Sequence, residues 1–126
     1  MGIFNSIFGK NSNEETTTFP WVPLESIEQL DTIVDESKEQ VVAIFKHSVR
    51  CGISAMVKRG FENHENSNSG VKLYYLDLIT YRPISNEIAD RFGVVHESPQ
   101  LIIIKNGEAI KATSHGSIND IDLSQF

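Results

Sequence analysis

The chain of 126 residues contains 1 cysteine, Cys51, and its thiol is the strongest candidate for chemistry. A lone cysteine excludes an internal disulfide, a Cys-rich zinc site and a two-thiol redox centre. Arg50 is adjacent in sequence, and a neighbouring cation favours the thiolate form of a cysteine. Ser54 follows three residues later, close enough on a helical turn to donate its hydroxyl proton toward the sulfur. The pattern predicts a nucleophilic thiolate.

The elements around Cys51 favour the same interpretation. The apolar, β-branched run at 41–45 predicts a strand that is buried on both faces. A helix is expected to begin at Cys51, and the unpaired amides at the start of a helix stabilise a thiolate. Lys46 and His47 are expected in the loop between the strand and this helix. The alternative is a cysteine that packs as a small buried hydrophobe. The helix is indicated by apolar residues with helical spacing, namely Ile53, Met56, Val57 and Phe61.

A second group of candidates precedes a third apolar strand at 101–104. Pro99 cannot donate a ladder N–H, so it must open this strand or lie in a turn. His96 lies in the same loop and is expected to face Cys51, as a base or thiolate partner. The alternative for His96 is a hydrogen-bonded surface histidine. The alternative for Pro99 is an ordinary trans proline that opens an edge strand. The other histidines considered for the same role are His47 and His115.

Hydrophobic periodicity predicts an α/β domain at residues 19–126 after a flexible polar tail at residues 1–18. The first two strands should be parallel, and Asn-Gly at 106–107 predicts a hairpin that makes the last pair antiparallel. The predicted architecture is a thioredoxin-like fold with a mixed four-stranded central sheet, helices on both faces and no extra N-terminal strand. The predicted helices cover 24–34, 53–61, 83–92 and 117–123, the last opened by a Ser117–Asp120 capping box, and the predicted strands cover 41–45, 71–78, 101–104 and 109–113.

Charge and composition exclude several classes of partner. The 11 basic and 17 acidic residues give a net charge of −6, so neither a nucleic acid nor an anionic membrane is expected as the main partner. No apolar run is long enough to span a membrane, and the first residues lack the basic region of a secretory signal. No motif predicts a metal site. The start at 1–6 fits a loose acylation pattern, although a short apolar tail that packs on protein is the commoner meaning.

The residues around Cys51 resemble those of a known family. The segment at 45–54 reads Phe-Lys-His-Ser-Val-Arg-Cys-Gly-Ile-Ser, preceded by Trp-Val-Pro-Leu at 21–24 and followed by Ser98–Pro99. These segments are similar to the monothiol bacilliredoxin family, over about residues 20–125. The resemblance implies a cytoplasmic thioredoxin-fold protein with no bound cofactor. Its co-substrate would be bacillithiol, and its partners would be proteins that carry bacillithiol in mixed disulfides.

The resemblance also implies roles for individual residues. Cys51 would be the nucleophile and would itself become bacillithiolated. Ser54 occupies the place of a resolving cysteine, Pro99 that of a cis-proline, and the Ser98 backbone would pair with an extended substrate. Gly52 departs from the family pattern, which has proline there, and the strand at 41–45 lacks a buried acidic residue. The expected catalytic group is Cys51, Ser54, Arg50 and His47, and the expected substrate-binding group is Ser98, Pro99, His96 and Gly52.

Three functions are compatible with the sequence. The first is a monothiol thiol–disulfide oxidoreductase that takes the small thiol from a protein and needs an outside thiol or reductase to turn over. The second is a non-catalytic module that binds an extended peptide beside Pro99. The third is a sensor whose Cys51 is oxidised by peroxide, and the absence of a resolving cysteine disfavours it.

Overall fold

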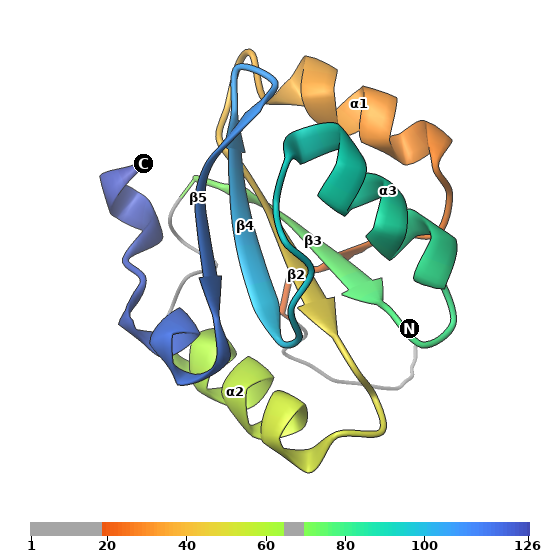
Figure 1. The fold of residues 1–126 in the computed structure, drawn as a ribbon. Helices are drawn as coiled ribbons and strands as arrows, with labels where there is room; N and C mark the ends of the chain where they lie inside the picture. Colours follow the sequence, from red (N-terminus) through yellow and green to blue (C-terminus); the bar gives the residue numbers. More distant parts are fainter. Residues whose placement is uncertain (1–18, 65–69) are drawn as a thin grey trace, which may run out of the picture.

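The computed structural model describes residues 19–64 and 70–126, so the predicted tail at 1–18 and its acylation pattern lie outside the described residues. The strands are β1 (Val22–Pro23), β2 (Val42–His47), β3 (Lys72–Asp77), β4 (Gln100–Lys105) and β5 (Glu108–Ser114). They form one sheet in the order β1-β3-β2-β4-β5 (Figure 1). β1, β3 and β2 are parallel, whereas β4 and β5 are each antiparallel to the preceding neighbour. The predicted thioredoxin-like fold is confirmed.

The sheet has one strand more than the sequence predicts. β1 has only two residues, and it pairs with β3 at Tyr74 and Tyr75. Two residues are too few to show the alternation by which a strand is recognised. Pro23 is tolerated because β1 lies at the edge of the sheet, where a missing N–H costs no ladder bond. The prediction of four strands without an N-terminal strand is therefore wrong.

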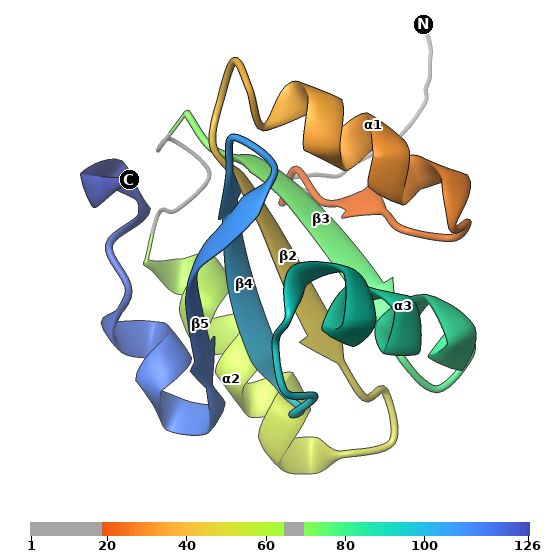
Figure 2. The ribbon, with the colours of Figure 1, turned by 45° about the horizontal axis from the view of Figure 1, so that its top comes forward.

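Helices cover both faces of the sheet (Figure 2). On one face lie α1 (Glu28–Glu36) and α3 (Arg82–Phe92), and on the other lies α2 (Gly52–Asn63). Pro83 lies in the first turn of α3, and Gly93 ends this helix in the left-handed conformation. In the described part of the chain, no helix is both long enough and apolar enough to cross a membrane.

The C-terminal segment is not the single helix predicted over 117–123. It forms two short 3-10 helices, η3 (His115–Asp120) and η4 (Leu123–Gln125), and η3 lies beside α2. Ser117 cannot cap a helix there because the chain is already helical from His115. Ile121 is extended and separates the two turns. The break allows Ile118 and Leu123, five residues apart, to be buried together.

Two apolar layers enclose the sheet, and their members alternate along each strand. In β2, Val42 and Ile44 face α1 and α3, whereas Ala43 and Phe45 face α2. Burial of these faces fixes the register of the sheet. The helical residues of the first layer are Leu30, Ile33, Ile84 and Ile88, and those of the second are Val57, Phe61, Ile118 and Leu123.

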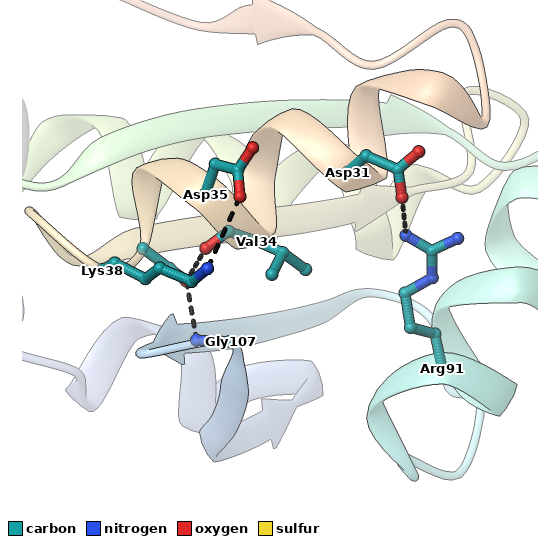
Figure 3. A network of polar contacts seen from close by, with 7 residues as sticks. Asp31, Val34, Asp35, Lys38, Arg91 and Gly107 are labelled. Atoms are coloured by element: carbon teal, nitrogen blue, oxygen red, sulfur yellow. Dashed lines mark hydrogen bonds and ion pairs between the residues drawn. The ribbon is translucent and has the colours of Figure 1, made fainter.

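Polar contacts hold α1 against the rest of the domain (Figure 3). Arg91 of α3 pairs with Asp31 of α1 at 2.8 Å. At the other end of α1, the buried Ser37 hydroxyl donates to the Val34 carbonyl and accepts from the Gly107 N–H at 2.8 Å. Gly107 lies in the β4–β5 turn, where both central residues have positive φ, as the Asn-Gly dipeptide predicts.

Candidate active site around Cys51

Cys51 lies where the sequence predicts it, between the buried strand β2 and the helix α2. It is the N-cap of α2, with an extended backbone at φ −107° and ψ 118°. Its carbonyl accepts from the Ala55 N–H, and its own N–H donates to the Ser48 carbonyl, both at 3.1 Å. The thiol is free and half-buried. The first amides of α2 have no intrahelical acceptor, so they place partial positive charge beside this residue.

Ser54 lies on the buried side of α2, three residues after Cys51. Its Oγ is 2.6 Å from Nδ1 of His47 and accepts from the Ser48 N–H at 3.3 Å. The hydroxyl that we expected to donate toward the Cys51 sulfur therefore has these two partners in the structure. Burial lowers the pKa of His47, so its ring is neutral at pH 7 and one of its nitrogens is an acceptor. With Nδ1 as the acceptor, Ser54 donates its single hydroxyl proton to His47.

The prediction that His47 lies in the loop is wrong, because His47 is the last residue of β2. The residue is 5% exposed, and its ring lies 5.8 Å from the Tyr75 ring between centroids. Burial is the largest cause of its lowered pKa, Lys58 adds to the effect, and two carboxylates oppose it. His47 therefore lies behind Ser54 and contacts the site only through that hydroxyl among the described residues of the first turn of α2.

Lys46 is also in β2 rather than in the Cys51 loop, and its side chain is completely buried on the α3 side of the sheet. Its Nζ is 3.4 Å from the Ser85 carbonyl and 3.4 Å from Nδ1 of His96. Burial lowers the pKa of Lys46 to about 8. The prediction that Lys46 is a loop cation beside Cys51 is wrong, because β2 extends two residues beyond the apolar run.

The Ser98–Pro99 loop opens β4 at the edge of the sheet where β2 ends, because β2 and β4 are antiparallel (Figure 1). The Ser98–Pro99 peptide bond is cis, as the family resemblance implies. Pro99 is buried, and its carbonyl accepts from the His115 N–H at 3.0 Å. Ser98 is half-buried, so its backbone lies near the surface at the edge that carries Cys51.

His96 is anchored from the interior of the domain. Its Nδ1 lies 3.2 Å from the Ser85 hydroxyl of α3 and 3.4 Å from Nζ of Lys46. Burial is the largest cause of its lowered pKa, and Lys46 is the largest electrostatic one. The sequence predicts that His96 lies at the catalytic edge, but it gives no sign of these two partners. Both come from segments distant in sequence.

Arg50 and Gly52 flank Cys51 and are both exposed. A Cβ added at Gly52 would meet no atom within 4 Å, so the departure from the family's proline does not reflect crowding. Gly52 is the first residue of α2, a position where proline is favoured. The surroundings of Cys51 therefore accept either residue.

Exposed apolar side chains occur in the segments next to Cys51 and Pro99, and the sequence analysis missed them. Ile53 and Met56 were expected on the buried stripe of α2, but they are 63% and 61% exposed. Val49 and Val95 are also exposed, in the loops before Cys51 and before Pro99. Among the large apolar side chains of the described residues, only Ile27 and Ile110 are exposed elsewhere. We call Val49, Ile53, Met56 and Val95 the apolar rim.

Comparison with known proteins agrees with this arrangement. The family model described as monothiol bacilliredoxin BrxC matches residues 22–123. A solved structure described as an oxidoreductase with a thioredoxin fold is 34% identical, covers 84% of this chain and 92% of its own, and has a TM-score of 0.73. Thioredoxin from Trypanosoma brucei brucei is 22% identical, with coverage of 86% and 88% and a TM-score of 0.65, and shows the fold alone. Thioredoxin from Malassezia sympodialis does the same at 20% identity, with coverage of 78% and 81% and a TM-score of 0.63. The chain therefore belongs to the monothiol bacilliredoxin family of thioredoxin-fold oxidoreductases.

Proposed function

We propose that the protein removes bacillithiol from mixed disulfides on other proteins, with Cys51 as the nucleophile. The observation that carries the proposal is the position of the one cysteine of the chain, at the N-cap of α2. The cis Ser98–Pro99 loop lies at the same edge of the sheet. A thiol at a helix N-terminus is activated for attack on a disulfide, and backbone near the surface can pair with an extended substrate.

The exchange reaction needs no cofactor. The Cys51 thiolate attacks the bacillithiol sulfur of the mixed disulfide and forms a new S–S bond with it. The old S–S bond breaks, its electron pair goes to the protein sulfur, and this thiolate takes a proton from solvent. Cys51 then carries bacillithiol. Because Ser54 has no thiol with which to attack, a second thiol molecule or a partner reductase must release the adduct.

The apolar rim supports a protein as the donor of the small thiol. A small sugar thiol offers little apolar surface, whereas a protein substrate can bury Ile53 and Met56 when it docks. Exposed side chains of this size contribute on the order of 1.5–3 kcal/mol each when fully buried. The rim therefore favours a protein substrate over a free small disulfide.

Intact-mass spectrometry tests the proposal directly. The protein is mixed with a bacillithiolated substrate protein, and we expect Cys51 to gain the mass of one bacillithiol while the substrate loses it. Cys51→Ser is the matched control, since it keeps the size of the residue and removes the nucleophile. The absence of an adduct on the parent protein, with the substrate still bacillithiolated, would overturn the proposal.

A further inference from the structure

A buried cation lies beneath the Ser98–Pro99 loop, on the face of the sheet opposite to α2. The Lys46 side chain is fully buried, and the groups that contact its Nζ in the described part of the chain, the Ser85 carbonyl and the His96 ring, are uncharged. A buried ammonium without a carboxylate destabilises a fold, and burial accordingly lowers the pKa of Lys46 to about 8. The ammonium is still charged at pH 7, so its charge acts on whatever lies beside it.

His96 is the titratable group beside this ammonium. An ammonium is only a donor, so Nδ1 of His96 must be the acceptor in the 3.4 Å contact with Lys46. The Ser85 hydroxyl, 3.2 Å away, can donate to the same nitrogen. The proton of the neutral ring must then be on Nε2. This nitrogen lies across the ring from Nδ1, so it points away from Lys46 and Ser85.

The charges around His96 favour the same neutral form. Burial lowers the pKa of His96, and the positive charges of Lys46 on β2 and Arg82 on α3 lower it further. Glu97, in the same loop as His96, acts in the opposite direction. The balance lowers the pKa from its ordinary value near 6.5, so the ring is neutral at pH 7.

Gln100 joins the same polar cluster to the loop. It is directly opposite Lys46 in the β2–β4 pairing, so both side chains leave the same face of the sheet. Its Nε2 donates to the Val95 carbonyl at 2.9 Å, which fixes the orientation of the amide. Its buried Oε1 has no hydrogen-bond partner among the described residues. An unpaired side-chain carbonyl thus shares this face of the sheet with the buried ammonium of Lys46.

We propose that Lys46 is a positioning residue that holds His96 as a neutral ring with its proton on Nε2, so that this N–H donates to the departing protein sulfur. The inference rests on the proposed exchange function. In that step the S–S bond of the substrate breaks and its electron pair goes to the protein sulfur, while Cys51 bonds to the small thiol. His96 donates a hydrogen bond and keeps its proton, because a neutral imidazole is a very weak acid. The departing thiolate takes its proton from solvent.

Nuclear magnetic resonance tests the positioning role without any substrate. Proton–nitrogen correlation spectra of the isotope-labelled protein near neutral pH should show His96 neutral and protonated on Nε2. In Lys46→Met, we expect the preference for this tautomer to weaken and the midpoint of the His96 titration to rise. The exposed His64 and His115 are internal controls that should not shift. A charged or Nδ1-protonated His96 in the parent, or an unchanged His96 in Lys46→Met, would overturn the proposal.

Ser85→Ala provides a second variant if Lys46→Met fails to fold. It removes the hydroxyl contact with His96 and keeps the Ser85 carbonyl that Lys46 contacts. We expect the Nε2 tautomer to persist in Ser85→Ala, because Lys46 still requires Nδ1 to accept. Loss of the tautomer preference in this variant would contradict the role of Lys46 and assign it to Ser85.

Kinetics tests the consequence for exchange. We expect His96→Phe and Lys46→Met to slow attack on a mixed disulfide whose departing group is an aliphatic peptide thiol about 10-fold, as for the loss of one hydrogen bond to a charged atom. With a strongly acidic aromatic leaving thiol, the loss should be smaller, since that thiolate needs less stabilisation. Alkylation of Cys51 by iodoacetamide releases no sulfur and should keep its rate. Equal losses with both leaving thiols would overturn the proposal.

These experiments separate the two hypotheses. If bacillithiolated protein gives no adduct but the peptide disulfides show the leaving-thiol dependence, the proposed substrate is wrong and the role of Lys46 stands. If adduct forms at the same rate in the parent and in Lys46→Met, the exchange function stands and the role of Lys46 is wrong.

Discussion

Nδ1 of His47 lies 2.6 Å from Oγ of Ser54, so the residue in the place of a resolving thiol is hydrogen-bonded to the strand behind it. Both residues are buried. The contact joins the first turn of α2 to the end of β2, the two elements that position Cys51. Ser54 therefore has a structural role at a position where a dithiol oxidoreductase would carry a second sulfur.

Ser54→Ala should destabilise the protein by about 1–3 kcal/mol, because the His47 ring and the Ser48 N–H both lose a buried partner. Urea unfolding monitored by circular dichroism measures the change. Ser117→Ala is the control, since Ser117 is exposed and its replacement should change the free energy of unfolding by less than about 0.5 kcal/mol. Equal stability of Ser54→Ala and the parent would contradict this structural role.

Lys46→Met should raise the free energy of unfolding at neutral pH by about 1–4 kcal/mol, because an apolar side chain of similar volume replaces a buried charge. The pKa of Lys46 falls from 10.5 in the unfolded chain to about 8 in the fold, so the unfolded state binds its proton more tightly. The cost of burial is complete below pH 8 and disappears as the pH rises through 10.5. The stability difference between variant and parent should shrink over that range. A difference that is constant with pH would show that the charge is not its cause.

Gly52→Pro should stabilise the protein by about 0.4–1 kcal/mol by restricting the unfolded chain. The backbone of Cys51, at φ −107° and ψ 118°, already has the extended conformation that a residue before proline prefers. Thermal unfolding measures the gain.

Gly60→Ala provides a contrast within the same helix. A Cβ at Gly60 would lie 2.8 Å from the side-chain nitrogen of Asn119, so this variant should be less stable than the parent. If Gly52→Pro destabilises the protein as much as Gly60→Ala does, the first turn of α2 is not as open as the structure indicates.

Ile53→Ser should raise the KM for a protein mixed disulfide roughly 3- to 10-fold, because it removes apolar surface from the rim. The rate with a small peptide disulfide, which covers less of the rim, should change little. Ile110→Ser is the matched control, since Ile110 is exposed on β5, outside the rim. Equal changes with both substrates would indicate that Ile53 affects Cys51 itself rather than docking.

The sequence allowed most of the fold to be predicted, because apolar periodicity and turn residues are local signals. Asn106–Gly107 specified the last hairpin, and the spacing of apolar residues located α2 and α3. The two-residue strand β1 was missed because it forms only by pairing with β3. The C-terminal 3-10 turns were missed because their apolar residues fit a helix equally well.

The site was predicted in part. The position of Cys51 followed from the order of strand and helix, and the cis bond at Pro99 followed from family resemblance. Lys46 and His47 were misplaced because polar residues after an apolar run usually mark its end. Here they extend the strand, because Ser85, distant in sequence, contacts Lys46 inside the domain, and Ser54, in the first turn of α2, contacts His47 there. Such partners leave no local pattern in a sequence.

The alternation of β2 sends Lys46 and His47, consecutive residues, into separate compartments of the domain. The sheet separates the Lys46 ammonium, below the Ser98–Pro99 loop, from the His47 imidazole, behind Ser54. A change in the polarity of one face therefore leaves the hydrogen bonds on the other face in place, so each cluster can vary in sequence independently of the other. Insertion of one residue in β2 before Lys46 would move each of the two side chains to the opposite face, so both would lose their hydrogen-bond partners.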